Sequence, residues 1–339
     1  MKQDMKKWVE ELKNTKEKKG FLVLSFPAIQ KMGITVKELV SSSDLQAEAM
    51  KIVADSTPEA LASVSMMDLS LEAEAFGSSV RFADDEVPTI IGSIVNSEEE
   101  AEALEIPEIG AGRTQIYVDA IEKAVKLIED RPVFAGVIGP FSLAGRLMDV
   151  TEAMIYCYDE PDMVHTVLQK ASGFLINYIN AYKAAGANGV VMAEPLAGLL
   201  SPALEEEFSS AYVKKIVDAT QTDDFIVIYH NCGNCTIQQI DSISKNGCKV
   251  LHFGNSIDME EMLQKAPCEL LIMGNLDPAG YFRNGTPDKV KEATMELLEK
   301  CSSYPNFIIS SGCDIPPLSS WDNIQAFFDG VEEYYHQNK

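Results

Sequence analysis

The stretch FIVIYHN, residues 225–231, is a short apolar and β-branched run that ends in polar residues and is followed by a helical pattern. Seven further runs have the same form, namely FLVLSFP (21–27), ALASVSM (60–66), FAGVIGP (134–140), GVVMAEP (189–195), KVLHFGN (249–255), ELLIMGN (269–275) and NFIISSG (306–312). Near-continuous apolar strands that alternate with helices are typical of a parallel sheet buried on both faces. Eight of them predict an α/β fold of the (β/α)8 TIM-barrel class.

Spaced apolar residues with helix-capping signals fill the intervals between these runs. Ser201 and Pro202 have the residue types of an N-cap and a first helical position, and Thr286 and Pro287 repeat that pair. The clearest predicted helices cover residues 159–186, 201–219, 286–301 and 319–337.

An open, doubly wound sheet is the alternative fold, because it uses the same repeat of strand and helix. It would normally carry a glycine-rich phosphate loop after the first strand, and FPAIQKMG has no such pattern. Residues 67–133 are longer than one crossover helix needs, so we interpret them as an insertion between the second and third strands. The sequence thus predicts one barrel domain over residues 1–339, with residues 1–20 as an N-terminal helical extension.

The charge balance excludes several classes of partner. The 339 residues include 28 Lys and Arg against 52 Asp and Glu, a formal net charge of −24. Such a surface repels phosphate backbones and anionic lipids, so we expect no nucleic-acid partner and no membrane partner. A hydrophobic content of 46% with 24% charged residues is that of a folded globular protein.

Membrane-spanning and secretory signals are missing from the sequence. No apolar run approaches the 18 to 20 residues, roughly, that cross a bilayer. The lysine-rich start before residues 21–29 is too long and too acidic for a signal peptide, and no small-residue cleavage site follows. The seven cysteines are therefore expected to be reduced thiols in a cytoplasmic protein.

Polar residues at the ends of the predicted strands are the candidates for chemistry, because barrel enzymes place catalytic groups there. The fifth predicted strand has the densest end, YHNCGNC, residues 229–235. His230 and Cys232 are two residues apart and project to the same side of an extended chain. Imidazole and thiolate together suit Zn²⁺, so the sequence predicts a zinc site here. The full set of strand-end candidates is Ser25, Asp68, Glu194, His230, Cys232, Asn255, Asn275, Asp277, Cys313 and Asp314.

Two cysteines compete for the place of a third protein ligand. Cys235 is local and would give H-x-C-x-x-C, whereas Cys313 follows a glycine at the end of the eighth predicted strand. Spacing favours Cys235, and the way barrel sites draw on several strand ends favours Cys313. His252, in the sixth predicted strand, is a minor alternative ligand. The remaining cysteines are expected to be packing residues, namely Cys157, Cys248, Cys268 and Cys301.

Six segments carry a family resemblance through their order and spacing. They are SLEAEAFGSSV (70–80), VIGPFSLAGRLM (137–148), MAEPLAGLLSP (192–202), YHNCG (229–233), GNLDPAG (274–280) and SSGCDIPPLSSWDNIQAF (310–327). The chain resembles the uroporphyrinogen decarboxylase superfamily and, within it, the zinc-dependent methylcobamide:coenzyme M methyltransferases. The metal motif of that group is His-x-Cys followed much later by Cys in a Gly-Cys context. The resemblance therefore implies His230, Cys232 and Cys313 as zinc ligands and prefers Cys313 to Cys235.

The resemblance also implies an activity. A thiol such as coenzyme M would occupy the open fourth position on zinc and accept a methyl group from a methylated corrinoid, itself carried by a separate corrinoid protein. Glu194 would orient the site or occupy the open position at rest. A carboxylate that caps the loop or helix that follows it is the alternative role for that residue.

Two other functions compete with methyl transfer. The decarboxylase branch binds a substrate with many carboxylates and needs several arginines in its pocket, notably near the N-terminus. This chain has only five arginines in all, and none lies in residues 21–33. A non-catalytic barrel that binds a corrinoid protein around a structural zinc is the second rival. That zinc would have four protein ligands, with Cys235 added to the set.

Overall fold

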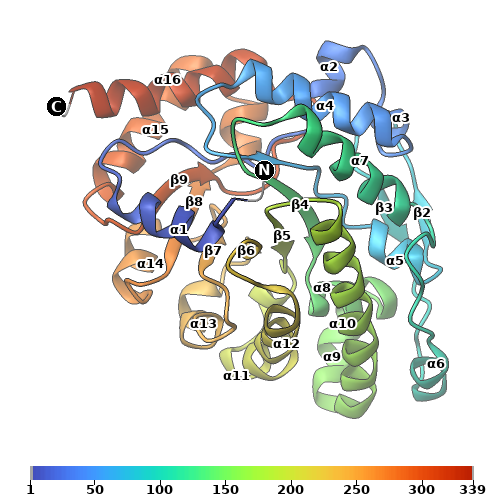
Figure 1. Cartoon of the computed structure of the whole chain (residues 1–339). Helices are drawn as coiled ribbons and strands as arrows, with labels where there is room; N and C mark the ends of the chain where they lie inside the picture. Colours follow the sequence, from blue (N-terminus) through green and yellow to red (C-terminus); the bar gives the residue numbers. More distant parts are fainter. Residues whose placement is uncertain (1–2, 338–339) are drawn as a thin grey trace.

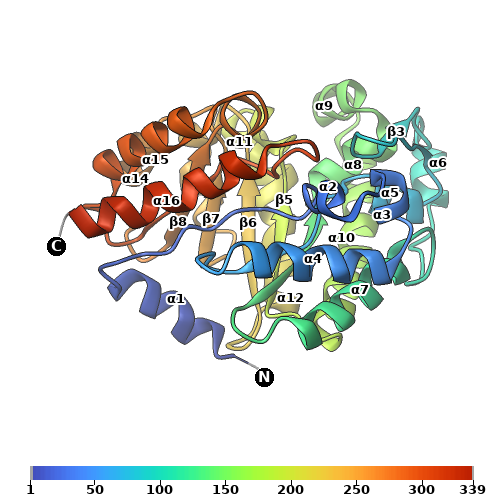
Figure 2. The ribbon, with the colours of Figure 1, turned by 90° about the horizontal axis from the view of Figure 1, so that it is seen from above.

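The structure, a computed structural model, describes residues 3–337 and contains a curled sheet of seven parallel strands (Figures 1 and 2). Every residue of these strands is buried, as a parallel sheet covered by helices requires. In spatial order they are β1 (Ser63–Val64), β4 (Val133–Ile138), β5 (Gly189–Ala193), β6 (Ile226–Asn231), β7 (Val250–Phe253), β8 (Leu271–Leu276) and β9 (Phe307–Ser311). A separate antiparallel pair consists of β2 (Ser79–Arg81) and β3 (Thr89–Ile91).

Helices surround the sheet. The predicted helices over 159–186, 286–301 and 319–337 are confirmed as α10, α15 and α16, whereas the one over 201–219 is interrupted by a π-helical turn, η2. Ser201 caps its helix by accepting a hydrogen bond from the Leu204 N–H, but Thr286 makes no such side-chain bond. The helices are α1 (Met5–Asn14), α2 (Ala28–Met32), α3 (Val36–Leu39), α4 (Ser43–Ser56), α5 (Leu71–Ala75), α6 (Glu98–Ala103), α7 (Thr114–Leu127), α8 (Pro140–Met148), α9 (Val150–Asp159), α10 (Pro161–Ala184), η1 (Ala197–Leu199), α11 (Pro202–Glu205), η2 (Glu206–Ser210), α12 (Ala211–Thr220), α13 (Thr236–Ile243), α14 (Met259–Lys265), η3 (Pro278–Arg283), α15 (Pro287–Cys301) and α16 (Trp321–Gln337).

The predicted first strand, residues 21–27, is not a regular strand, and this corrects the expected count of eight. Phe21 forms a single parallel bridge with Ser310 in β9, and the Leu61 N–H donates to the Gly20 carbonyl just before β1. Beyond Phe21 the ladder ends, because the Val23 N–H donates to the Ser311 hydroxyl instead of to a backbone carbonyl. Residues 21–27 therefore begin between β9 and β1, but the Ser311 side chain takes the place of a regular backbone partner.

The core has two parts. Inside the curl, a small cluster joins side chains of successive strands, including Phe134, Val191, Ile228 and Ile308, and a larger cluster fills the space between sheet and helices. Helix α1 covers the amino-terminal ends of the strands, where the Trp8 ring lies 5.9 Å from the ring of Phe134, measured between centroids. The opposite edge of the sheet is thus the one on which loops after the strands gather.

Two further predictions concern domain organisation. Residues 67–133 carry α5, β2, β3, α6 and α7, and α7 packs on α4. Helix α1 lies within the predicted extension, residues 1–20, of which 1 and 2 lie outside the described residues, as do 338 and 339 of the predicted single domain. The insertion and the domain boundaries stay predictions.

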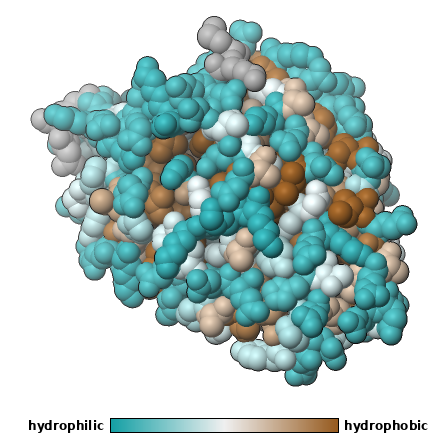
Figure 3. All heavy atoms as spheres, turned by 60° about the horizontal axis from the view of Figure 1, so that its bottom comes forward, coloured by the Kyte–Doolittle hydropathy of each residue, from teal (hydrophilic) through white to brown (hydrophobic). Residues whose placement is uncertain are grey.

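The exposed surface agrees with the composition. Figure 3 shows hydrophilic side chains over most of one face, with apolar side chains in small separate groups. Within residues 3–337, no helix is long and apolar enough to cross a lipid bilayer.

Candidate metal centre

His230 is placed by the end of a buried strand. It is 3% exposed and lies in β6, in register with Ala193 of β5 and His252 of β7. Its Nδ1 is 2.7 Å from Nδ1 of His252, and Nε2 of His252 is 2.7 Å from the Ser310 hydroxyl oxygen. The other nitrogen of His230, Nε2, is buried and has no hydrogen-bond partner. A buried polar atom without a partner is costly, so Nε2 is available to a ligand.

Cys232 is placed by a tight turn after β6. The Asn231 side chain accepts a hydrogen bond from the Gly233 N–H at 2.9 Å, which bends the chain back. A Cβ at Gly233 would lie 2.4 Å from Cα of Gly198, so only glycine fits this contact between two loops. Gly254, after β7, packs equally closely against Cys232 itself.

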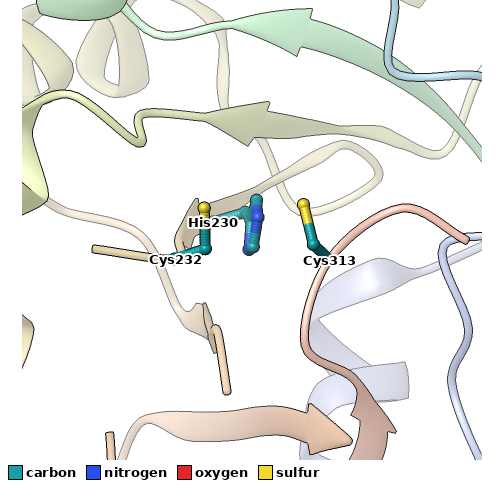
Figure 4. Close-up of side chains that lie close together, drawn as sticks. All are labelled: His230, Cys232 and Cys313. Atoms are coloured by element: carbon teal, nitrogen blue, oxygen red, sulfur yellow. The ribbon is translucent and has the colours of Figure 1, made fainter. Parts of the chain in front are cut away.

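Cys313 reaches the same place from β9. A Cβ at Gly312 would lie 2.8 Å from the backbone nitrogen of Asn255, so the glycine lets the loop after β9 press against the loop after β7. The ligand atoms of His230, Cys232 and Cys313 lie within 4.8 Å of one another. Figure 4 shows the imidazole between the two thiols. One ring nitrogen and two sulfurs are the donor set that tetrahedral Zn²⁺ prefers, with one position left open.

The two thiols are electrostatically unequal. A hydrogen bond from Cys313 lowers the pKa of Cys232, and the neighbouring His230 side chain lowers it further, against the opposing effect of burial. The same hydrogen bond, together with burial, raises the pKa of Cys313. Cys232 is therefore the thiol that ionises more easily, and a metal that binds both sulfurs must displace the proton of Cys313.

The two alternative ligands, Cys235 and His252, make hydrogen bonds with other residues. Cys235 occupies the position before α13, and its thiol faces the Asn234 side-chain oxygen at 3.4 Å. His252 uses both ring nitrogens for hydrogen bonds, and burial lowers its pKa well below the usual value, so it stays neutral. Over residues 3–337, neither belongs to the group whose ligand atoms meet.

Glu194, at the end of β5, is fully buried and caps a helix. Its carboxylate accepts hydrogen bonds from the Phe141 N–H at 2.7 Å and the Ser142 N–H at 2.9 Å, which are in the first turn of α8. The Ser209 hydroxyl donates a third at 3.0 Å. Burial raises the pKa of Glu194 to about 7 despite these bonds. Its oxygens are thus directed at α8, the helix after the neighbouring strand, and it is outside the three-residue group.

The remaining strand-end candidates make contacts that hold the loops together. Asp68 forms an ion pair with Arg113 at 2.6 Å, and Asp314 accepts a hydrogen bond from the Met67 N–H at 3.1 Å. The others are Ser25, which donates to the Val64 carbonyl, Asn255, which packs on Gly312, Asn275, which donates to the Gly254 and Ile257 carbonyls, and Asp277, which caps η3.

The sequence alone did not predict the support of His230 by other side chains. His252 supports His230, a role that its place on the adjacent predicted strand could have suggested, and Ser310 completes that chain of hydrogen bonds. The expectation for the remaining cysteines is wrong at Cys268, which is exposed in the loop between α14 and β8, while Cys157, Cys248 and Cys301 are buried.

Proteins with similar sequences include examples of two activities. The methylcobamide:CoM methyltransferase MtbA of Methanosarcina acetivorans is 28% identical over 272 residues, which cover 79% of this chain and 78% of that protein. A uroporphyrinogen decarboxylase of Coxiella burnetii is 25% identical over 291 residues, covering 82% and 78%.

Solved structures show the same fold. A methyltransferase from Methanosarcina mazei superimposes with a TM-score of 0.86 at 21% identity over 98% of each chain. A B12-independent methionine synthase from Shewanella gives a TM-score of 0.62 at 12% identity over 89% of each chain. Residues 23–334 match the family described as uroporphyrinogen decarboxylase (URO-D). The chain belongs to the uroporphyrinogen decarboxylase family.

Proposed function

We propose that this protein is a zinc-dependent methyltransferase that moves a methyl group from a methylated corrinoid to a small thiol. One observation carries the proposal: the ligand atoms of His230, Cys232 and Cys313 meet within 4.8 Å while Nε2 of His230 has no other partner. The similarity to MtbA, whose name gives a methylcobamide donor and CoM as acceptor, supports the same reaction class.

The residues of the chain have separate tasks in this proposal. His230, Cys232 and Cys313 would hold Zn²⁺, which when bound lowers the pKa of a coordinated thiol so that it is a thiolate at neutral pH. His252 would accept a hydrogen bond from the Nδ1–H of His230 and donate one from its own Nε2 to Ser310, which would fix the ring so that Nε2 of His230 faces the two thiols.

The group transfer balances without a redox partner. The thiol loses its proton, its sulfur forms a bond to the methyl carbon, and the cobalt–carbon bond breaks. The electron pair of that bond stays on cobalt. The products are a methyl thioether and the cob(I) form of the corrinoid.

The decarboxylase relatives make that activity the main competing proposal. Arg113 is neutralised by Asp68 and Glu74, at 2.6 and 2.7 Å, and Arg131 is paired with Asp130. The chain therefore has few free arginines for a substrate with many carboxylates. A cluster of one imidazole and two thiols also has no task in such a pocket.

A structural zinc in a non-catalytic barrel would need a fourth protein ligand. Cys235 faces Asn234, and the carboxylate of Glu194 accepts hydrogen bonds from α8, so both nearby candidates have other contacts. Three protein ligands support an open position for substrate.

A separate corrinoid protein is the proposed methyl carrier. It would dock over the carboxyl ends of the strands, where the metal ligands lie. Two leucines of the loops after β5 and β9 support such a contact, since Leu199 is 48% exposed and Leu318 is 36% exposed. We further propose that residues 67–133 are an insertion on a single barrel domain with residues 1–20 as its extension, and that residues 21–27 occupy the position of the eighth strand.

The test is an absorbance assay of free methylcobalamin with a panel of thiols, with and without a chelator. We expect cob(I)alamin to form with at least one thiol, and we expect the chelator to stop it. A chain that retains zinc but demethylates methylcobalamin with none of the thiols would contradict the proposal.

A further inference from the structure

A small cavity lies beside β3 and the loop after β1. It has a volume of about 230 Å³ and is lined by Met67, Leu69, Ser70, residues 87–90 and Arg146. Met67 links this lining to the loop that carries Cys313, because the Met67 N–H donates to Asp314, which directly follows Cys313. The lining is apolar or uncharged except for one guanidinium.

Arg146, in the last turn of α8, differs from the other arginines. Arg113 and Arg131 have ion pairs, and Arg81 and Arg283 are exposed to solvent. Arg146 is half-buried, and within residues 3–337 its guanidinium has no hydrogen-bond or ion-pair partner. Burial lowers its pKa, as expected for a cation without a counter-ion.

An unpaired cation beside an apolar cavity is costly for folding alone. It becomes favourable when an anion enters the cavity, because a guanidinium binds oxyanions through two parallel hydrogen bonds. In a chain of net charge −24, a positive group that is not neutralised by its own carboxylates stands out as a site for anionic ligands.

We propose that this cavity is an anion subsite in which Arg146 binds the acid group of a substrate of the methyl transfer. The inference rests on the proposed function, since it places one end of a substrate of the methyl transfer in this cavity. The oxyanion is either the sulfonate or carboxylate of the thiol acceptor or the phosphate in the nucleotide tail of the corrinoid. Arg146 is then a specificity-determining residue.

The first measurement is calorimetric binding to the zinc-loaded protein. The probes are 2-mercaptoethanesulfonate and 2-mercaptoethanol, which differ in the acid group, and methylcobalamin and methylcobinamide, which differ in the phosphate-bearing tail. Arg146→Met removes the charge, Arg146→Lys keeps the charge without the planar fork, and Arg283→Met is the control that removes an exposed arginine.

Arg146→Met is expected to weaken binding of one probe that carries an acid group by about 10- to 100-fold and to leave binding of the counterpart without that group unchanged. Loss with the sulfonate assigns the subsite to the acceptor, and loss with methylcobalamin assigns it to the corrinoid. Arg146→Lys should fall between the native protein and Arg146→Met. Binding of all four probes unchanged in Arg146→Met would overturn the proposal.

Two controls separate this proposal from others. Arg146→Met should unfold at the same or a higher temperature than the native protein, and a lower unfolding temperature, or failure to fold, would assign Arg146 to structure and overturn the subsite. If the native protein transfers no methyl group but Arg146-dependent anion binding persists, the proposed function fails and the subsite stands. If the native protein transfers a methyl group but Arg146→Met binds all four probes as the native protein does, the proposed function stands and the subsite fails.

Discussion

Two regions at the same edge of the sheet bury ionisable side chains. One is the loop after β1, and the other is formed by the loops after β6 and β9. Around β1, Asp68 accepts from Arg113 at 2.6 Å, from the Tyr117 hydroxyl at 2.8 Å and from Ser70 at 2.6 Å. Around β6 and β9, by contrast, Nε2 of His230 has no partner and two thiols face each other. The satisfied cluster is expected to stabilise the fold, and the unsatisfied one to bind a ligand.

The largest effect should come from the unsatisfied cluster. Cys232→Ala or Cys313→Ala removes one of three ligands, so we expect both zinc retention and methylcobalamin demethylation to be abolished, as measured by metal analysis and by absorbance. Cys235→Ala is the matched control and should keep both. Metal loss in Cys235→Ala together with retention in Cys313→Ala would reverse the assignment.

Changes in the satisfied cluster around Asp68 should lower the stability of the fold and leave zinc binding unchanged. Arg113→Met leaves Asp68 buried without its cation and is expected to lower the free energy of unfolding by about 3 to 5 kcal/mol, measured with urea. Lys214→Met breaks the exposed pair with Asp218 and should cost at most about 0.5 kcal/mol. The zinc content of folded Arg113→Met should equal that of the native protein, and a loss of zinc there would remove the distinction between the two clusters.

A smaller effect is expected behind the metal ligands. His252→Phe removes the acceptor for Nδ1 of His230, so zinc affinity should fall by about 10- to 100-fold in a chelator competition. Ser310→Ala should act in the same direction and less strongly. His336→Gln, on the exposed last turn of α16, is the control. A zinc affinity of His252→Phe equal to that of the native protein would show that the His230 ring needs no support.

The last expected effect is a dependence of stability on pH. Burial raises the pKa of Glu72, beside the satisfied cluster, to about 8. The unfolded chain loses this proton near pH 4.5, so the folded state holds more protons between about pH 5 and 8, and stability must fall as pH rises through that range. Glu194 and Asp314, each with a pKa raised to about 7, act in the same direction. Glu72→Gln should flatten the curve of unfolding free energy against pH, and an unchanged slope would contradict a neutral Glu72.

The sequence pattern predicted seven of the strands, because each is buried on both faces and reads as an apolar run. It failed at residues 21–27, where the Ser311 side chain takes the place of a backbone partner, a tertiary contact that no local pattern contains. His230 and Cys232 were predictable from their spacing on one strand. Cys313 required the family resemblance, because its approach depends on the fit of Gly312 against Asn255. The pairing of Glu194 with α8 and the isolation of Arg146 appear only once the helices are packed.

X-ray absorption of the zinc-loaded protein, before and after addition of a thiol, tests the central claim most directly. The account predicts one ring nitrogen and two sulfurs from the protein, with a third sulfur when the thiol is added. Four protein ligands that do not change on addition of the thiol would contradict an open catalytic site.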